Sequence, residues 1–464
     1  MRSDEIKIRF HTLGCKLNFA ETSTLARQFA EGGYVRVSRD DEADLFVVNT
    51  CSVTADADKK GRNLIRKLHR LRPGAPIVVT GCYAQLRPDE IAAIEGVSLV
   101  VGNSRKGDLF ARTDALVKAR HVKENQQVGT VEECIPTEVV STEFLIKDGA
   151  HRAVCAGGQE IFAAYSSGDR TRAFLKVQDG CDYLCSYCTV PHARGASRNI
   201  PIANAVRAAR EIAAAGQREI VLTGINTGDF GRTTGESFAD LLRALDRVEG
   251  IARYRISSIE PNLLTDEMIA LTASSAKFQP HFHIPLQNGS DAVLRRMGRR
   301  YTTQMFADRA AAVRRAIPDA FLGIDVIVGF PGETNSDFEA TYAFLERLEP
   351  AYLHVFPYSV RPGTPASDMD GKVPPQTIAA RAARLGELSG RLHRAFHERH
   401  VGQTAEVLFE STVRDGRMAG FTGNYLRVSA PHDRSQVNRL VRVSLDSLDK
   451  RGEIRGTILP DELF

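Results

Sequence analysis

From Arg172 onward, strand-like apolar runs recur, and most of them are separated by a helical stretch. The six runs are AFLKVQ, EIVLTGIN, RYRISSIEP, HFHIPLQNGSD, LGIDVIVGFPGET and YLHVFPYS, and helical patterns cover 202–216, 238–248 and 303–317. Strands that alternate with helices form parallel sheets covered by those helices. We therefore expect an incomplete (β/α)6 barrel, whose chemistry would be located at the carboxyl ends of its strands.

Three cysteines directly follow the first of these strands. They lie in GCDYLCSYCTVP, with the spacing Cys181-x-x-x-Cys185-x-x-Cys188 and an aromatic residue, Tyr187, before the last one. A tetrahedral zinc site or a 4Fe-4S cluster normally takes four protein ligands. No fourth cysteine follows within reach, so a cluster bound here would keep one iron open. The alternative is a zinc site completed by a distant histidine such as His192.

Near the N-terminus, three further apolar runs each lead into a cysteine. IKIRFHTLGC ends at Cys15, DLFVVNTC at Cys51 and PIVVTGC at Cys82, and a helix-like segment follows each one. This is a βαβαβ pattern, which predicts an open parallel sheet. The carboxyl ends of parallel strands line one edge, so we expect the three thiols to converge there. Three ordinary buried cysteines are the alternative.

The rest of the chain divides into a linker, a long helix and an all-β segment. Turn-forming and polar residues in 122–171 predict a linker with a short hairpin, in which Cys134 and Cys155 have no ligand spacing and are interpreted as ordinary thiols. A helix is expected over 376–400, and short alternating strands after it predict a small β-barrel. The expected domains are 1–121, 122–171, 172–400 and 401–464.

Composition narrows the class of protein. The chain has 464 residues, of which 43% are hydrophobic and 25% charged, as in globular proteins with several domains. It has no apolar run of membrane-spanning length, and its first ten residues are too charged for a signal peptide, so we expect a cytoplasmic protein. Eight cysteines without an export signal favour metal ligation or redox chemistry over disulfides.

Two basic runs are candidates for RNA contact. In KKGRNLIRKLHRLRPG the apolar residues Leu64, Ile65 and Leu68 share one helical face, which leaves most basic residues on the other face. RRMGRRY follows the fourth barrel strand. Such faces suit a phosphate backbone, although an ordinary solvated helix face gives the same pattern. The C-terminal β segment has equal numbers of acidic and basic residues, so charge gives no sign of RNA binding there.

The Cys181, Cys185 and Cys188 spacing resembles the radical S-adenosylmethionine (SAM) enzymes. In that family three thiolates hold a 4Fe-4S cluster, and SAM binds the open iron. The resemblance implies that these cysteines are the catalytic and metal-binding residues. Residues beside the motif and at the following strand ends are the expected SAM contacts: Tyr187, Gly224, Asn226, Glu260 and Gln287.

The order of domains narrows the resemblance to the methylthiotransferases, over essentially the whole chain. That family joins an N-terminal domain, a radical SAM domain and an RNA-binding barrel of the TRAM type. The resemblance implies a second 4Fe-4S cluster on Cys15, Cys51 and Cys82. It also implies that two SAM molecules are used, one to methylate sulfur and one to make a 5′-deoxyadenosyl radical. A tRNA substrate and a flavodoxin- or ferredoxin-like electron donor are the implied partners.

The segment TLGCKLNFAET is similar to the TLGCKxNxxET motif of the branch that acts on threonylcarbamoyladenosine in tRNA, and it departs from many relatives only at Phe19, where they have a polar or tyrosine-like residue. We therefore expect methylthiolation of carbon 2 of this nucleoside beside the anticodon. The alternatives are isopentenyladenosine in tRNA, an aspartate of a ribosomal protein, and a non-catalytic iron-sulfur protein for RNA binding or electron transfer. The threonylcarbamoyl carboxylate calls for a cation, for which Arg194 and Arg198 are candidates.

Overall fold

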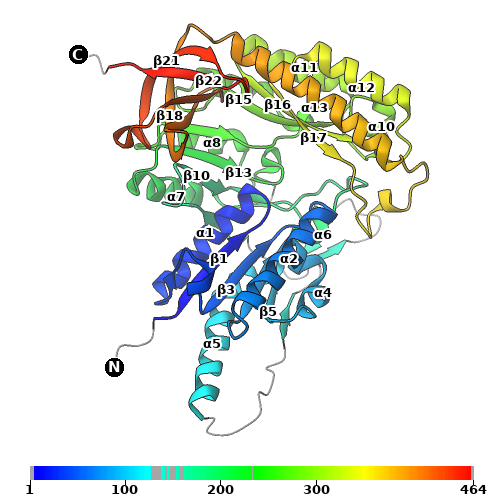
Figure 1. Cartoon of the computed structure of the whole chain (residues 1–464). Helices are drawn as coiled ribbons and strands as arrows, with labels where there is room; N and C mark the ends of the chain where they lie inside the picture. The colour runs from blue at the N-terminus through cyan, green and yellow to red at the C-terminus, as the bar shows by residue number, and fades with distance from the viewer. Residues whose placement is uncertain are drawn as a thin grey trace. The chain divides into compact units, whose positions relative to one another are not determined.

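A computed structural model describes residues 5–126, 137–141, 144–146, 153–155, 161–232 and 234–460. The chain forms two compact units. The first comprises 1–166, 179–184 and 188–198, and the second comprises 167–178, 185–187 and 199–464. Both units contain parallel sheets, and the second also contains a closed β-barrel (Figure 1). The mixed α/β class predicted from the sequence is confirmed.

The first unit is built on a parallel sheet of six strands. Their order is β2 (Val35–Arg36), β1 (Lys7–Thr12), β3 (Leu45–Thr50), β4 (Ile77–Gly81), β5 (Val97–Gly102) and β6 (Glu138–Val140). Strands β3, β4 and β5 are buried along their whole length, as expected where helices cover both faces of a parallel sheet.

Helices cover both faces of this sheet. On one face, an apolar cluster joins the strands to α2 (Ala55–Leu71), α3 (Cys82–Leu86) and α4 (Pro88–Ala92). On the other face, a second cluster joins them to α1 (Lys16–Glu31) and α5 (Leu109–Gln126). Val47 and Val78 belong to one cluster while Val48 and Val79 belong to the other, because successive strand residues point to opposite faces.

The segment 122–171 holds more structure than the linker interpretation predicts. It supplies β6, which pairs with β5 at the edge of the sheet. It also contains the expected short hairpin, in which β7 (Phe144–Ile146) pairs antiparallel with β8 (Ala153–Cys155). Cys134 and the side chain of Cys155 lie outside the described residues.

The second unit contains the six parallel strands predicted for the incomplete barrel. Strands β10 (Arg172–Lys176), β13 (Glu219–Thr223) and β14 (Arg253–Ile256) pair in that order, as do β15 (His281–Gln287), β16 (Phe321–Val328) and β17 (Tyr352–Pro357). Parallel bridges at Tyr254–Phe278 and Ser258–His283 connect the two groups. The main helices between the strands are α7 (Ile202–Ala214), α8 (Phe238–Asp246), α9 (Asp266–Ser274), α11 (Thr303–Ala316) and α12 (Asn335–Leu348).

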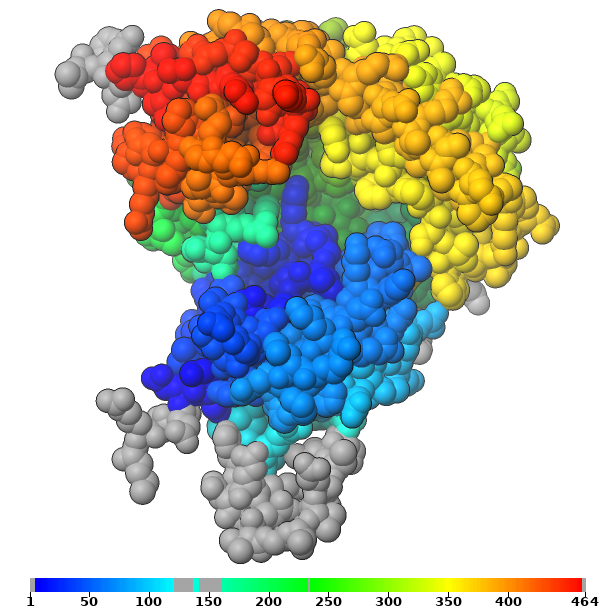
Figure 2. Space-filling view, in the orientation of Figure 1, coloured from blue at the N-terminus to red at the C-terminus, as the bar shows by residue number. Residues whose placement is uncertain are grey.

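A long helix and a small barrel complete this unit. The helix α13 (Pro375–Glu398) packs against β17 and β21, and Figure 2 shows it beside the C-terminal barrel. The closed barrel has the strand order β18 (Thr404–Arg414), β19 (Arg417–Thr422), β20 (Arg427–Pro431), β22 (Ile454–Ile458) and β21 (Leu440–Leu448). Buried Arg253 and Arg255 donate to backbone carbonyls of this barrel, which fastens it to β14.

Within the described part of the chain, every helix is too short or too polar to cross a lipid bilayer.

Candidate cofactor sites

The three N-terminal cysteines lie where neighbouring strands end. Cys15 is the residue before α1, Cys51 directly follows β3, and Cys82 begins α3 directly after β4. Because β1, β3 and β4 are adjacent and parallel, these ends share one edge of the sheet. Burial, followed by the charges of Cys82 and Cys15, raises the pKa of the Cys51 thiol to about 12. The three cysteines therefore lie at one edge of the sheet, as the sequence predicts.

Two glycines allow the backbone to approach these thiols. Gly14 has φ +102, and a Cβ at this position would lie 2.6 Å from the Cβ and 2.9 Å from the Sγ of Cys51. Gly81, also at φ +102, precedes Cys82, and a Cβ there would lie 2.3 Å from the carbonyl oxygen of Thr50. Only glycine adopts such a conformation at this proximity without strain. These two glycines thus allow the backbone to pass close to the cysteines at the strand ends.

Two asparagines form hydrogen bonds beside Cys15, Cys51 and Cys82, which are called the N-terminal trio below. Asn18 donates to the carbonyls of Leu13 at 2.8 Å and Thr50 at 2.9 Å, which ties two strand ends together. Asn103 donates through Nδ2 to the Sγ of Cys82 at 3.5 Å. Hydrogen bonds to sulfur are a common means of stabilising thiolates that ligate iron. This donor set fits an iron-sulfur cluster, because it offers three thiols and a donor to sulfur.

A buried charge network lies beside the trio. Arg194 closes α6 (Val190–Arg194), which packs against α3 within the first unit. Its Nη1 lies 3.0 Å from Glu21 and 2.9 Å from Asp179. Lys106 also forms an ion pair with Glu21, and the side chains of Lys106, Glu21 and Arg194 are each no more than 2% exposed. Two cations and two carboxylates therefore balance one another inside the unit.

This network corrects the expectation that Arg194 is a cation for substrate. Its guanidinium is buried and is held by two carboxylates and by Asn18, so it has a structural role. It also lowers the pKa of the Cys51 thiol, although less than burial raises it. Arg198 is the other candidate, and its Nη2 lies 3.8 Å from Asp179 with 15% of the side chain exposed.

The cysteines of the C-x-x-x-C-x-x-C loop accept hydrogen bonds at sulfur. The amide of Tyr183 donates to the Sγ of Cys181 at 3.3 Å, and the amide of Val190 donates to the Sγ of Cys188 at 3.4 Å. These contacts lie in the first unit. They are the local environment that favours ligation of iron by thiolates.

Cys185 belongs to the second unit, and its sulfur has a different hydrogen-bond partner there. The guanidinium of Arg299 lies 3.0 Å from its Sγ and 3.4 Å from the hydroxyl of Tyr187, and it also forms an ion pair with Glu260. Burial raises the pKa of the Cys185 thiol, and the charge of Arg299 lowers it. The ring of Tyr187 packs edge-on against Phe330. Cys185, Tyr187 and Glu260 are thus connected through one arginine.

The other expected SAM contacts lie at strand ends. The side chain of Asn226 accepts from the amide of Glu260 at 3.4 Å, and its buried Nδ2 has no hydrogen-bond partner in the described part of the chain. A buried donor without a partner is what a polar ligand would satisfy. Gly224 follows β13, and a Cβ there would lie 2.9 Å from Gln178. Gln287 ends β15 at a bulge, with φ +68.

Arg299 is the functional residue that the sequence interpretation missed. It belongs to RRMGRRY, which was expected to form an exposed basic cluster, yet its side chain is only 3% exposed. Arg295, Arg296 and Arg300 of the same run are exposed. The chain leaves α10 (Asp291–Arg296) and turns at Gly298, whose φ is +73. That glycine is the signal that the run does not continue as one helical face.

Comparisons with known proteins follow this division of the chain. Residues 7–102 match a family model described as uncharacterized protein family UPF0004, and residues 175–345 match the radical SAM superfamily. A threonylcarbamoyladenosine tRNA methylthiotransferase from Bacillus subtilis is 39% identical, covering 94% of this chain and 93% of the relative. The protein of the same description from Aquifex aeolicus is 35% identical, covering 94% and 100%.

Another relative has a different substrate in its name. A tRNA-2-methylthio-N6-dimethylallyladenosine synthase from Acidothermus cellulolyticus is 34% identical, covering 86% of this chain and 76% of that protein. Among solved structures, the radical SAM methyltransferase TsrM from Kitasatospora setae superposes with a TM-score of 0.54 at 16% identity, covering 78% and 77%. That likeness supports the fold. On the full-length similarity to its relatives, the chain belongs to the family of radical SAM tRNA methylthiotransferases.

Proposed function

We propose that this enzyme methylthiolates carbon 2 of threonylcarbamoyladenosine beside the anticodon of tRNA. The observation that carries the proposal is the full-length similarity to relatives named for this reaction. Two further features support it. One is the segment TLGCKLNFAET, which runs from the end of β1 into α1, and the other is a second set of three cysteines in addition to the radical SAM loop.

We infer that each trio holds one 4Fe-4S cluster. Cys181, Cys185 and Cys188 would hold the cluster that binds SAM, and the N-terminal trio would hold the second. When bound, these groups supply one-electron cleavage of SAM and the sulfur that is transferred to an unactivated carbon. The high pKa of Cys51 means that iron binding must displace its proton, so cluster assembly is expected to release protons.

The protein's own side chains prepare the SAM-binding cluster. Arg299 favours the thiolate form of Cys185 and the ionised form of the buried Glu260. Desolvation raises the pKa of Glu260, and Arg299 lowers it. The unpartnered amide of Asn226 is available to a carboxylate or hydroxyl of the cosubstrate. We propose Tyr187, Gly224, Asn226, Glu260 and Gln287 as the residues around SAM.

The proposed partners are the tRNA substrate and an electron donor. A small reductant of the flavodoxin or ferredoxin type would deliver single electrons to the SAM-binding cluster.

Mass spectrometry of tRNA nucleosides from a strain that lacks this gene tests the proposal. We expect loss of the methylthio form of threonylcarbamoyladenosine, with the unmodified nucleoside retained. Expression of the wild-type chain should restore it, and expression of Cys51→Ala should not. Persistence of the methylthio nucleoside in the deletion strain, or loss of a methylthiolated ribosomal aspartate instead, would overturn the proposal.

Isopentenyladenosine is the second candidate substrate, because a relative named for that nucleoside is 34% identical to this chain. The same nucleoside profile separates the two, since each gives its own methylthio product.

A non-catalytic role is tested by anaerobic reduction in the presence of SAM. We expect 5′-deoxyadenosine from the wild type and from Cys51→Ala, and none from Cys185→Ala. Absence of 5′-deoxyadenosine from a wild-type chain with both clusters intact would favour an electron-transfer or RNA-binding protein.

A further inference from the structure

The two candidate nucleosides differ in the polarity of the group on N6. A threonylcarbamoyl group carries a carboxylate, a hydroxyl and amide N–H groups, whereas an isopentenyl group is apolar. An enzyme that selects the first needs donors and an acceptor in its pocket. Arg194 does not supply them, because it is buried in its own network.

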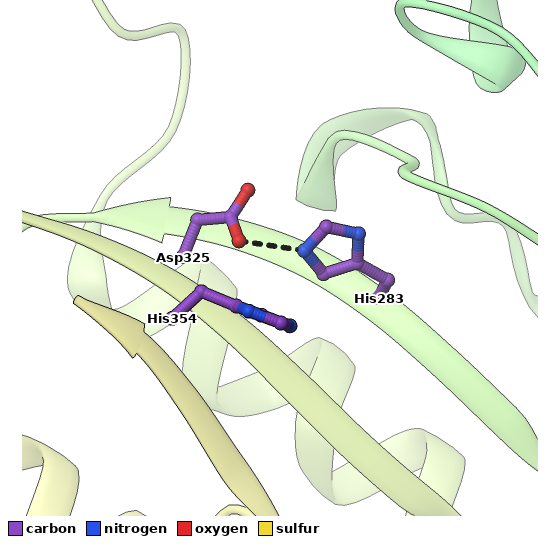
Figure 3. A group of neighbouring side chains, drawn as sticks. All are labelled: His283, Asp325 and His354. Carbon is purple, nitrogen blue, oxygen red and sulfur yellow. Dashed lines mark hydrogen bonds and ion pairs between the residues drawn. The ribbon is translucent and has the colours of Figure 1, made fainter. Parts of the chain in front are cut away.

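Three polar side chains that offer both donors and an acceptor lie on three neighbouring barrel strands. His283 is on β15, Asp325 on β16 and His354 on β17, and one polar atom from each lies within 4.8 Å of the others. The Nε2 of His283 is 2.6 Å from the Oδ1 of Asp325. Figure 3 shows this contact, with the ring of His354 beside the pair.

The register of the strands places the group on the inner face of the barrel. Asp325 pairs directly with His354, and His283 pairs with Gly323, two residues before Asp325. The Leu353 side chain is buried, whereas His354 is exposed. Successive strand residues point to opposite faces, so His354 lies on the face opposite the buried Leu353 side chain.

The group is accessible from inside the barrel. The side chains of His283 and Asp325 are 23% and 18% exposed, and His354 is exposed. Gly323 borders the pair, since a Cβ there would lie 3.8 Å from the Cδ2 of His283 and 3.2 Å from the Cε1 of Phe321. The ring of Tyr352 stands edge-on to His354, with the ring centres 4.7 Å apart. A ligand would therefore contact an imidazole that lies between an aromatic ring and the hydrogen-bonded His283–Asp325 pair.

We propose that His283, Asp325 and His354 bind the threonylcarbamoyl group and so determine the choice of nucleoside. This inference rests on the proposed function. His354 donates to the carboxylate of the substituent. His283 donates to Oδ1 of Asp325, which leaves Oδ2 to accept from the carbamoyl N–H or the hydroxyl. An isopentenyl group offers no donor or acceptor to these side chains, and a site built from polar groups disfavours the apolar analogue.

Two imidazoles and a carboxylate are also a ligand set for a divalent transition metal. A metal ion would occupy the same atoms that the substituent would contact. The test therefore has to distinguish the two occupants.

The test compares reconstituted wild type with His354→Phe on two tRNAs, one bearing threonylcarbamoyladenosine and one bearing isopentenyladenosine. His354→Phe should lower kcat/KM on the first by about 10-fold or more and shift the ratio between the two tRNAs toward the second. Asp325→Asn should also lower the ratio of kcat/KM on the threonylcarbamoyladenosine tRNA to kcat/KM on the isopentenyladenosine tRNA. SAM cleavage without tRNA should be unchanged in His354→Phe. His432→Phe, on an exposed loop of the C-terminal barrel, is the matched control and should keep the wild-type ratio.

Each outcome decides between the proposals. If the wild type modifies only isopentenyladenosine, the proposed function fails. If the wild type modifies threonylcarbamoyladenosine and His354→Phe keeps the same ratio, the assignment of this group fails. Elemental analysis of the holoenzyme covers the other occupant: a stoichiometric metal other than iron that is lost in His354→Phe would show a metal site and overturn substrate recognition.

Discussion

The guanidinium of Arg299 lies 3.0 Å from the sulfur of Cys185 while it forms an ion pair with Glu260. The side chains of Arg299 and Glu260 are 3% and 11% exposed. If one of them is replaced, the charge of the other therefore stays buried and is not solvated by water. One arginine therefore supports both a proposed cluster ligand and a proposed SAM contact.

Arg299→Met is expected to lower the free energy of unfolding by about 3–5 kcal/mol, because it leaves the Glu260 carboxylate buried without a partner. Adding Glu260→Gln should recover part of this loss. Urea denaturation of the apo-protein under anaerobic conditions measures both. Arg309→Met is the control, since the Asp266 of its ion pair is 82% exposed and the pair should contribute at most about 1 kcal/mol. Equal losses in both variants would contradict this account.

Glu21→Gln is expected to destabilise the first unit by a similar amount. The carboxylate lies between Arg194 and Lys106, and its removal leaves excess positive charge at a site that is 1% exposed. We expect a loss of about 3–5 kcal/mol. Lys106→Met in the same chain should reduce that loss, because it restores the charge balance.

The control for this variant is Glu42→Gln, whose side chain is 44% exposed and pairs with Arg39 at 3.8 Å. It should change the free energy of unfolding by less than about 0.5 kcal/mol. A double variant less stable than Glu21→Gln alone would show that packing of the lysine stem, and not charge balance, dominates.

The sequence correctly predicts that Cys15, Cys51 and Cys82 lie at one edge of the sheet, but it predicts the surroundings of the cysteines poorly. Cys15, Cys51 and Cys82 are predictable because each terminates a local apolar run, and parallel strand ends necessarily meet. Arg194 and Glu21 are 173 positions apart, so no local pattern links them. The burial of Arg299 is equally unpredictable, because a run of basic residues does not show which of its side chains is buried.

The polar group on the barrel strands was beyond sequence reasoning for a related reason. Alternation along β15, β16 and β17 identifies which residues share a face, but it does not fix the relative register of three strands. In the folded sheet His283 pairs with Gly323, and Asp325 pairs with His354. Only the folded sheet brings His283 diagonally opposite Asp325.

Gly14→Ala is expected to remove the N-terminal cluster selectively. The added Cβ would lie 2.6 Å from the Cβ of Cys51, so the thiol must move. Iron per chain should fall by about half, while SAM-dependent formation of 5′-deoxyadenosine continues. Gly33→Ala is the matched control: its φ of +89 is equally strained, but nothing lies within 4 Å of the new Cβ. Full iron content in Gly14→Ala would contradict the assignment of this site.

The exposed face of α2 is expected to contact the tRNA backbone. Ile65 and Leu68 are buried against the sheet, whereas Arg66 and Arg70 are exposed one turn apart. Replacing both arginines by Gln should weaken tRNA binding and reduce the slope of log affinity against log salt by about 1–2.

Filter binding at several salt concentrations measures this slope. The control pair is Arg207→Gln with Arg210→Gln, two exposed arginines at similar spacing on α7. Identical slopes for the two double variants would show that the α2 face is an ordinary solvated surface.

Stability of the second unit is expected to fall as the pH is lowered from about 6.5 to about 4. Burial, and then the charge of His397, lowers the pKa of His393 to about 4, whereas an unfolded histidine titrates near 6.5. Between these values the unfolded chain binds a proton that the folded chain does not, so the free energy of unfolding decreases with decreasing pH. The ring of His393 packs 5.5 Å from Tyr352 on β17 and 4.1 Å from His397. Because His393 is partly solvated, we expect its share to be about 1–2 kcal/mol.

His393→Gln removes this group from the titration. Thermal unfolding followed by tyrosine fluorescence at pH 7 and pH 4.5 should therefore show a smaller loss of stability on acidification in the variant than in the wild type. His432→Gln, on an exposed loop, controls for the general effect of losing a histidine. Carboxylates titrate in the same window but are common to all three chains, so the difference between variants isolates His393. An identical acid-induced loss in His393→Gln and wild type would mean that the imidazole is hydrated in the folded chain and that its neighbours on α13 do not exclude water.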